Sequence, residues 1–277
     1  MLNPPPALSV IIPASNEAAW IGPCLAAVFA SDPVPGGAEV IVVANGCRDR
    51  TAEIARAVPV PAGWEMTVLD LAEGSKPGAL NAGGAVARGR VLAWLDADCL
   101  VSPGVMAGLV AALAGPRALY AGATPQIPRA KSWFTRAYAR FWQQLPFAQS
   151  TAPGYGLYAT NPEGRARWGE FPRLISDDTF VRLRFEPEER VQIAAPYAWP
   201  MVEGFAALVR VRRRQDLGVR ELAATFPGIL EREGKASLGA GGLIRLAARD
   251  PLGFAAYAAV ALAVRRRQGG AEFTRGR

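Results

Sequence analysis

The 277-residue chain has no histidine and only three cysteines. Without histidine it cannot build a Ser-His-Asp triad, a Cys-His pair or a histidine-containing metal site. A general base must then be a carboxylate, or less readily a lysine, tyrosine or cysteine. Because Cys24, Cys47 and Cys99 are odd in number and far apart, we expect reduced thiols and no disulfide framework.

Targeting signals and long hydrophobic runs are also missing. Residues 1–6 show neither the basic nor the apolar region of a signal peptide, so we expect a cytoplasmic protein. The longest late apolar stretch, residues 252–264, is too short to span a bilayer and is flanked by Arg249 and by residues 265–267, all arginine. Two readings stay open: a helix lying on an anionic membrane surface, or a helix packed on the domain with a basic tail.

The composition fits a protein with a sizeable core. Apolar residues make up 51% of the chain, enough for one large α/β domain, alone or with an appendage. The net charge is +7, and much of the excess follows Arg182, in residues 210–214 and 265–267. This distribution favours contact with phosphate or an anionic membrane surface. Since basic and aromatic residues do not interleave there, we expect no nucleic-acid partner.

Four strand and helix patterns alternate in the first hundred residues. Strands are predicted at 8–12, 39–44, 66–71 and 90–96, which indicates a parallel sheet covered by helices on both faces. Open sheets of this kind bind ligands beyond the carboxyl ends of their strands. Polar residues gather there: Ser15, Glu17, Asn45, Lys76, Asp96 and Asp98.

Further along, the pattern predicts helices at 103–114 and 132–147 and strands at 119–123 and 154–160. The second of these helices carries a stripe formed by Trp133, Phe134, Tyr138, Phe141 and Trp142, and such a stripe is typical of core packing rather than of a binding surface. The region after residue 185 is predicted to be mostly helical. No Walker A sequence or dinucleotide-binding glycine fingerprint follows the first strand.

Two aspartates end the fourth predicted strand. Asp96 and Asp98 have the side-chain period of a strand, so both can project to one side. Two hard oxygen ligands suit Mg²⁺ or Mn²⁺ bound jointly with substrate phosphates. An acidic turn after a strand explains the same residues without a metal.

A second acidic pair, Asp177 and Asp178, opens a predicted helix. Acids in a first helical turn are favoured by the helix dipole, which is a purely structural explanation. The functional explanation is a carboxylate base on the pocket floor, with the pKa of Asp178 raised by burial or by Asp177.

Taken together, the motifs resemble the GT-A glycosyltransferases of family 2. The resemblance is carried in order by Pro-x-x-Asn-Glu at 13–17, Asn-Gly-Cys-x-Asp-x-Thr at 45–51, Lys-x-x-Ala-Leu-Asn at 76–81, Asp-Ala-Asp at 96–98 and Asp-Asp-Thr-Phe-Val-Arg at 177–182. It implies an α/β fold with a Rossmann-like, mostly parallel sheet flanked by helices and a helical basic C-terminal appendage.

The resemblance also implies a division of the chain. Residues 1–215 would form the GT-A domain, with a nucleotide-binding half at 7–123 and an acceptor half at 124–215. Residues 216–277 would form the basic helical extension, with membrane-surface contact as one of its two open roles.

The implied activity is that of a metal-dependent inverting glycosyltransferase. A sugar would pass from a nucleotide-diphosphate donor, UDP-sugar favoured over GDP-sugar, to a hydroxyl of a saccharide or lipid-linked acceptor, in cell-surface polysaccharide or glycolipid synthesis. Asp178 would be the base, and Asp98 would hold Mg²⁺ or Mn²⁺. The residues implied to contact the nucleotide-sugar are Pro13, Ala14, Glu17, Asn45, Lys76, Asn81, Asp96 and Ala97.

The sequence departs from the family pattern at two places. Asn45 stands where an acid usually contacts the base, which leaves uracil specificity open. Processive members carry Gln-x-x-Arg-Trp after the base, whereas residues 211–215 read Val-Arg-Arg-Arg-Gln, so we expect a non-processive hexosyltransferase. Asp177, Arg213 and Arg214 are candidates for diphosphate or acceptor contacts, with a solvated basic helix as the alternative for the arginines.

A non-catalytic nucleotide-sugar-binding or regulatory protein is the alternative function. The acid at position 178 argues against it. A sugar-1-phosphate nucleotidyltransferase would need a glycine-rich, basic signature after the first strand, and residues 13–17 lack one.

Overall fold

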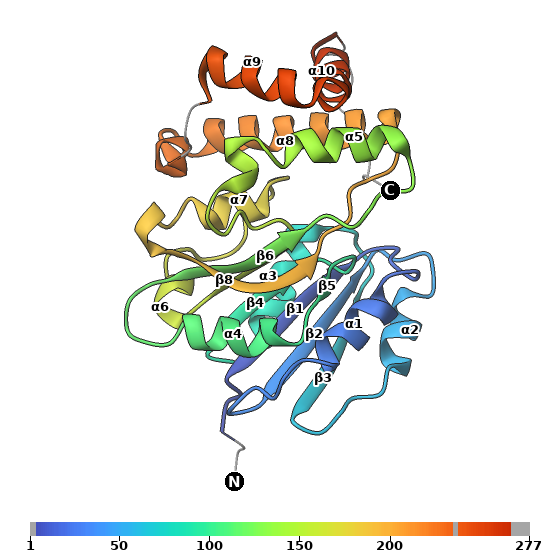
Figure 1. The fold of residues 1–277 in the computed structure, drawn as a ribbon. Helices are drawn as coiled ribbons and strands as arrows, with labels where there is room; N and C mark the ends of the chain where they lie inside the picture. Colours follow the sequence, from blue (N-terminus) through green and yellow to red (C-terminus); the bar gives the residue numbers. More distant parts are fainter. Residues whose placement is uncertain (1–3, 235–237, 267–277) are drawn as a thin grey trace.

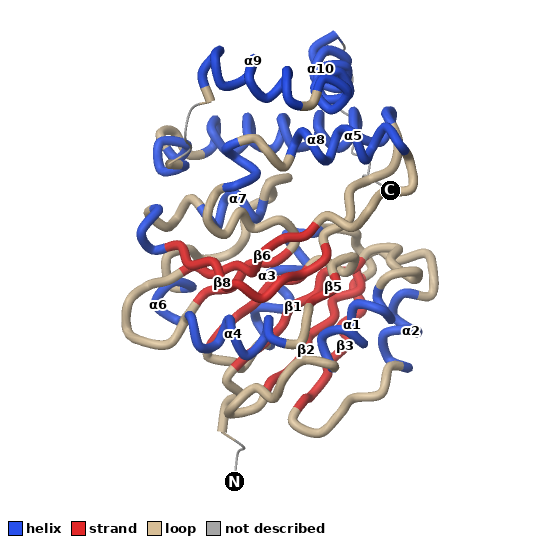
Figure 2. Tube along the Cα trace, viewed as in Figure 1, coloured by secondary structure: helices blue, strands red, loops and turns tan. Residues whose placement is uncertain are grey.

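A computed structural model describes residues 4–234 and 238–266. An eight-stranded sheet crosses the molecule, in the order β3-β2-β1-β4-β7-β6-β8-β5, with helices on both faces and a separate helical layer above it (Figures 1 and 2). The strands are β1 (Leu8–Ala14), β2 (Ala38–Asn45), β3 (Trp64–Leu71), β4 (Val91–Leu95), β5 (Leu100–Val101), β6 (Tyr120–Gln126), β7 (Leu157–Thr160) and β8 (Arg190–Ala198).

In the first half of the chain the helices alternate with the strands, and most of the later helices form the layer above the sheet. They are α1 (Ile21–Phe29), α2 (Thr51–Ala57), α3 (Lys76–Val86), α4 (Gly104–Ala112), α5 (Trp133–Trp142), α6 (Pro162–Arg165), α7 (Asp177–Arg182), α8 (Phe205–Thr225), α9 (Gly239–Arg249) and α10 (Pro251–Arg266). Short 3₁₀ turns are η1 (Pro146–Gln149), η2 (Pro187–Glu189) and η3 (Ile229–Glu233).

The predicted parallel half of the sheet is confirmed. β1 pairs in parallel with β2 and β4, and β2 with β3, which brings their carboxyl ends to one edge. β1 is buried on both faces: Val10 and Ile12 belong to the core cluster that includes α1 and α4, and Ile11 to the cluster that includes α3 and α7. Burial on both faces is why this strand is a continuous apolar run.

The second half of the sheet was only partly predicted. β7 runs antiparallel to β4 and β6, and β8 pairs with β6 in parallel. The helical prediction after residue 185 is wrong for β8, whose strand pattern is masked by Arg190, Gln192 and Pro196. α1 also begins at Ile21 rather than Ala18, because residues 17–20 form a turn in which Trp20 N donates to Glu17 O over 2.9 Å.

Four helices, α5, α8, α9 and α10, form the layer above the sheet, which we call the helical lobe (Figure 1). Tyr138 and Trp142 of α5 pack with Leu208 of α8 and with Val260 of α10 in one cluster. The aromatic stripe of α5 is therefore largely core, as predicted, although Trp133 is 67% exposed.

The predicted appendage packs closely on the domain. α10 rests on α5 through ring contacts of Phe141 with Phe254 and Tyr257. Just before α10, Asp250 accepts hydrogen bonds from Arg140 Nε at 2.8 Å and from Arg140 Nη2 at 2.7 Å. The proposed border at residues 215 and 216 falls inside α8. Arg267, part of the predicted basic cluster, lies outside the described residues.

None of the helices in residues 4–234 and 238–266 combines the length and apolar character that crossing a bilayer would require.

Candidate active site

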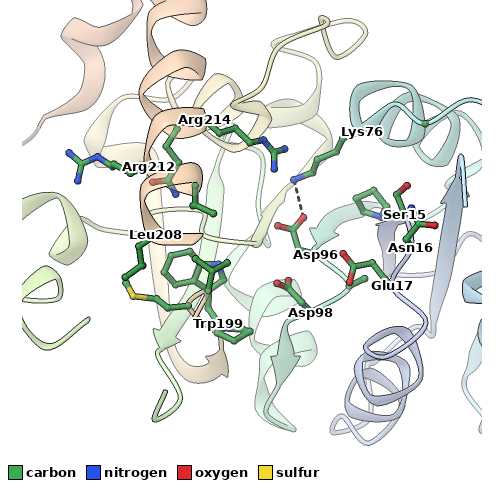
Figure 3. Close-up of a pocket in the computed structure, with 18 of the residues that line it drawn as sticks. Ser15, Asn16, Glu17, Lys76, Asp96, Asp98, Trp199, Leu208, Arg212 and Arg214 are labelled. Carbon is green, nitrogen blue, oxygen red and sulfur yellow. Dashed lines mark ion pairs between the residues drawn. The ribbon is translucent and has the colours of Figure 1, made fainter. Parts of the chain in front are cut away.

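One cavity of about 410 Å³ lies between the carboxyl edge of the parallel strands and the helical lobe (Figure 3). Its two walls differ in chemistry, with acids, amides and Lys76 on the strand side and mostly apolar side chains on the lobe side. Of the residues predicted to form the site, the cavity wall includes Pro13, Glu17, Asn45, Lys76, Asp96, Ala97, Asp98 and Arg214. The convergence expected from successive strand ends is therefore observed.

The loops after β1 and β2 are locked together at the strand side. Glu17 N donates to Thr51 Oγ1 at 2.8 Å, and Arg48 N donates to Asn16 Oδ1 at 2.7 Å. Asn16 has a φ of 56°, in the left-handed region that asparagine tolerates better than most residues. These bonds hold the cavity-lining backbone near Glu17 in one conformation.

Asn45 has a structural role as well as a place on the wall. Its side chain is 3% exposed, and Nδ2 donates to Ala14 O at 3.0 Å and to Val43 O at 3.2 Å. The amide nitrogen thus ties the end of β2 to the end of β1. Ala14, predicted to contact the nucleotide, is fully buried in the core and is not part of the wall.

Lys76 stands between two carboxylates from distant parts of the chain. Nζ lies 2.9 Å from Asp96 Oδ1 at the end of β4 and 3.0 Å from Asp177 Oδ1 at the start of α7. Ser75 places it at the first position of α3 by accepting a hydrogen bond from Gly78 N at 3.1 Å. Burial alone would lower the pKa of Lys76, but the charges of Asp177, Asp96 and Asp178 outweigh it and raise that pKa, so the ammonium stays charged.

Asp178 lines a small adjoining cavity of about 20 Å³ that shares Lys76 and Asp96 with the larger one. Burial, reinforced by the neighbouring charge of Asp177, raises the pKa of Asp178 to about 6. Thr179 N donates to Asp178 Oδ1 at 2.7 Å and fixes one oxygen, while Tyr158 Oη donates to Asp177 Oδ2 at 3.2 Å. The sequence analysis required a raised pKa for a base at this position, and the pKa of Asp178 is raised.

The acidic residues of the cavity suit a metal ion that is coordinated partly by the protein and partly by a bound ligand, rather than by protein side chains alone. Within the described residues, no group of three or more acidic or cysteine side chains is arranged to hold an ion. Asp96 is paired with Lys76, whereas Asp98 faces the cavity beside Glu17 (Figure 3). One or two carboxylates plus substrate phosphates are a usual ligand set for Mg²⁺, so the donor chemistry at Asp98 fits a divalent ion.

Two predicted site residues point elsewhere. Asn81 Nδ2 donates to Phe171 O at 3.1 Å, and Asn81 Oδ1 accepts from Phe171 N at 2.7 Å, so this amide pins the segment before α7 and does not line the cavity. Arg213 Nη2 donates to Ala263 O of α10 at 2.7 Å on the other side of α8. Arg214 of α8 extends into the cavity toward Lys76, whereas Arg212, which also lines the cavity, points away from Lys76 (Figure 3).

Apart from Arg214, the lobe wall of the cavity was not predicted from the sequence. It consists of Tyr138, Trp142, Trp199, Pro200, Met201, Val202, Leu208 and Val211, followed by Arg212, Arg214 and Gln215. Residues 199–202 follow β8, the strand that the sequence did not reveal. Without that strand, no pattern signals that this segment returns to the carboxyl edge.

Comparison with known proteins adds family and fold. A family model described as glycosyl transferase family 2 matches residues 9–165. The glycosyltransferase AglE of Haloferax volcanii is 42% identical over 95 residues, which cover 34% of this chain and 31% of that relative. The match thus spans about a third of the relative's length.

Two solved structures share the fold at low identity. The mannosyltransferase PcManGT of Pyrobaculum calidifontis, in complex with GDP-Man and Mn²⁺, has a TM-score of 0.60 at 20% identity and covers 96% of this chain and 77% of its own. Glucosyl-3-phosphoglycerate synthase of Mycobacterium tuberculosis, in complex with Mn²⁺, UDP and glucosyl-3-phosphoglycerate, has a TM-score of 0.55 at 21% identity. The match covers 84% of this chain and 82% of that chain. The GT-A-like architecture expected from the sequence is confirmed.

Proposed function

The chain belongs to glycosyl transferase family 2, and on that premise we propose that it is an inverting, non-processive hexosyltransferase that uses a nucleotide-diphosphate sugar. The observation that carries the proposal is Asp178, a carboxylate with a pKa raised to about 6 beside the Lys76–Asp96 pair at the edge of the main cavity. A binding protein has no need of a buried acid tuned toward neutral pH, whereas a general base does.

The strand side of the cavity is the proposed donor site. Pro13, Glu17 and Asn45 would line the nucleotide, and Ala97 would lie beneath the sugar. Asp96, held by Lys76, would orient a ribose or sugar hydroxyl. Relatives in fold carry GDP-Man or UDP in their crystals, so both a UDP-sugar and a GDP-sugar are reasonable donors, with the UDP-sugar favoured.

Asp98 is the proposed ligand of Mg²⁺ or Mn²⁺. When bound there, the ion would supply positive charge to the leaving diphosphate. Arg214, which points into the cavity from α8, would add a second cation on the lobe side. The presence of Mn²⁺ in both structural relatives supports this assignment.

Asp178 is the proposed base for the acceptor hydroxyl. Above its pKa the free oxygen accepts the hydroxyl proton as the sugar bond forms. Asp177 keeps Lys76 in place and, through its charge, keeps the pKa of Asp178 high. The acceptor would enter from the lobe side, since the strand side is occupied by the donor. A saccharide or lipid-linked acceptor in cell-surface polysaccharide or glycolipid synthesis remains the proposed context.

The test is a thermal-shift and transfer assay with UDP-, GDP- and dTDP-sugars, with and without Mn²⁺. A donor at about a hundred times its Kd should stabilise the fold by about 2.7 kcal/mol. Asp98→Ala should lose at least about 100-fold in transfer, because even supporting residues around a metal ligand cost 10–100-fold. The matched control is Asp70→Ala, an exposed acid outside the cavity.

Two outcomes would contradict this proposal. Full transfer by Asp98→Ala in the presence of EDTA would remove the metal role. Donor binding without hydrolysis or transfer to any acceptor would favour the alternative, a nucleotide-sugar-binding regulatory protein.

A further inference from the structure

The helix that carries Asp178 is too short to hold its own position. α7 has six residues, and a helix of this length is not stable in water without tertiary contacts. Asp178 lies in its first turn and Arg182 lies four residues later, so the two side chains are neighbours on one face of the helix. Whatever holds Arg182 therefore also sets where Asp178 lies.

Arg182 is buried and paired with an acid from a distant segment. Its Nη1 donates to Glu233 Oε1 of η3 at 2.7 Å, and the two side chains are only 5% and 13% exposed. η3 is itself held, because Arg190 Nη1 of β8 donates to the backbone oxygen of Glu233 at 3.1 Å. Removing one partner of a buried ion pair is strongly destabilising, so the pair fixes the end of α7.

The same guanidinium also holds a loop that precedes β7. Arg182 Nε donates to Ala152 O at 3.2 Å. Ala152 has a φ of 45°, which costs free energy in an alanine, and its N–H donates to Gln192 Oε1 at 2.9 Å. The bonds from both sides keep Ala152 in this unfavourable conformation.

This loop leads directly to the reacting groups. Gly154 and Gly156 line the small cavity of Asp178. A Cβ placed on Gly154 would lie 3.6 Å from the Cβ of Asp178, so the loop backbone lies next to the base with no side chain between them. Gly156 O accepts from Asp96 N at 2.7 Å. One guanidinium therefore joins η3, the loop and α7.

We propose that the Arg182–Glu233 pair positions Asp178 for proton transfer without touching the substrate. This inference rests on the proposed role of Asp178 as the base and adds two positioning residues to it. Neither Arg182 nor Glu233 lines the main cavity or the small one. We therefore expect their loss to lower kcat and to leave donor binding unchanged, since a displacement of about 1 Å at a reacting group can cost about 10²-fold.

The charges of the pair provide a readout that packing alone does not. The other charged and titratable groups around Asp178 are Asp177, Lys76, Asp96, Tyr120, Tyr155 and Tyr158. Burial raises the pKa of the three tyrosines, so they stay neutral near pH 7. Because Arg182 and Glu233 carry opposite charges, removing one or the other should move the pKa of Asp178 in opposite directions.

The experiment compares Glu233→Gln, Arg182→Gln and the double variant with the wild type. The measured reaction is hydrolysis of the nucleotide-sugar that binds the wild type in the thermal-shift screen, with Mn²⁺ present and water in place of the acceptor hydroxyl. kcat is followed from pH 4.5 to 8, and the donor Kd is measured by calorimetry. We expect kcat to fall about 10²-fold in all three variants at an unchanged donor Kd.

The acidic limb of the pH profile should respond to the sign of the charge that is removed. Glu233→Gln should move it to lower pH, because loss of a negative charge favours the carboxylate form of Asp178, and Arg182→Gln should move it to higher pH. In the double variant the limb should return to its original place while kcat stays low. The double variant also leaves no charge of this pair buried alone, which guards against misfolding of a single variant.

Glu39→Gln is the matched control. Glu39 is 4% exposed and pairs with Arg88 Nη2 at 2.7 Å, near the start of β2 and so at the opposite end of the strands from the cavity. Its loss should lower stability in urea, as the loss of Glu233 does, and should leave kcat and the acidic limb unchanged.

The outcomes separate this inference from the proposed function. A wild-type kcat in the double variant, or acidic limbs that do not move in opposite directions, would overturn the positioning role and leave the transferase function intact. A donor Kd that weakens in step with kcat, or an equal loss of kcat in Glu39→Gln, would also overturn it in favour of a general structural role. If Asp178→Asn hydrolyses the donor as fast as the wild type, the proposed base fails, and the positioning role fails with it.

Discussion

Asp178 owes its chemistry to its surroundings rather than to its residue type. Burial and the charge of Asp177 raise its pKa to about 6, while Lys76 works in the opposite direction. Its conjugate base is therefore formed just below neutral pH, where it is both available and basic enough to take a proton. In the proposed mechanism only the deprotonated form of Asp178 acts as the base, and this fixes the direction of the pH dependence.

We predict that transfer activity rises with pH through about 6 and then levels off, since Asp178 must lose its proton to act as base. Asp178→Asn should reduce kcat by about 10²–10⁴-fold and retain donor binding. Steady-state kinetics from pH 4.5 to 8, with donor binding measured by calorimetry, would test both.

A second variant tests whether Asp178 acts as the base or is only a buried acid. Asp177→Asn removes a charge that raises the pKa of Asp178, so the acidic limb should move to lower pH. An unmoved limb in Asp177→Asn, or unchanged transfer in Asp178→Asn, would rule out Asp178 as the base.

At the scale of elements, the sequence predicted what depends on local pattern. β1, β2 and β4 are apolar runs that end in polar residues, and their order and direction follow from the alternation with helices. The predicted donor wall at Glu17, Lys76, Asp96 and Asp98 follows from the same logic. The raised pKa of Asp178 depends first on its burial, which comes from the fold, and second on the charge of Asp177, which the acid pair at the start of α7 indicates.

What could not be predicted depends on contacts across the fold. β8 begins with Arg190, a charged residue that argues against a buried strand. Arg190 is nevertheless buried, and its Nη2 donates to the backbone carbonyl of Phe185 at 2.8 Å, so a tertiary hydrogen bond offsets the cost of burying it. Asn81 and Arg213 have the residue types of ligand contacts, and only their partners, Phe171 and Ala263, reveal what they do. Residues 199–202 of the lobe wall directly follow β8, so they could not be placed at the cavity without predicting that strand.

Asn81 offers a prediction at this scale. Its two hydrogen bonds join α3 to the segment that leads into α7, so Asn81→Ala should lower the free energy of unfolding by about 1–3 kcal/mol. We expect kcat to fall as Asp178 loses its position, and the donor KM to stay unchanged. Urea denaturation and steady-state kinetics would measure these effects.

Gln143→Ala is the control for Asn81→Ala, because Gln143 is exposed and its side-chain amide donates to Ala139 O of the preceding helix α5 at 3.1 Å. If Asn81→Ala weakens donor binding while stability is unchanged, the original expectation of a nucleotide-sugar contact at Asn81 is correct after all.

At the scale of the whole molecule, the helical lobe carries a face that the rest of the chain does not cover. α9 has no buried residue, and it contacts the body of the protein mainly through α10. Ile244 and Leu252 are each 69% exposed, and Leu243 is 37% exposed. Arg245 and Arg249 are exposed on α9, the helix that carries Leu243 and Ile244, whereas Leu252 lies at the start of α10.

We therefore propose that an anionic membrane surface binds this face, with the apolar side chains entering the interface and the arginines reaching lipid phosphates. α10 packs on α5, so residues 252–264 are part of the fold, as one of the two alternatives from the sequence expects. The other alternative, contact with an anionic membrane surface, stays a prediction, and the exposed apolar side chains of α9 and of the start of α10 are where we expect it.

The corresponding prediction is vesicle binding that depends on both apolar contact and charge. Vesicles of phosphatidylcholine with phosphatidylglycerol should bind the protein at least about 10-fold more tightly than phosphatidylcholine alone, because each arginine near an anionic surface contributes about 1 kcal/mol. Ile244→Glu with Leu252→Glu should abolish co-sedimentation. Val60→Glu, an equally polar change at a side chain that is 41% exposed between α2 and β3, should not. Equal binding to both vesicle types, or retained binding by the double variant, would mean that this face does not bind membranes and would leave the transferase site unaffected.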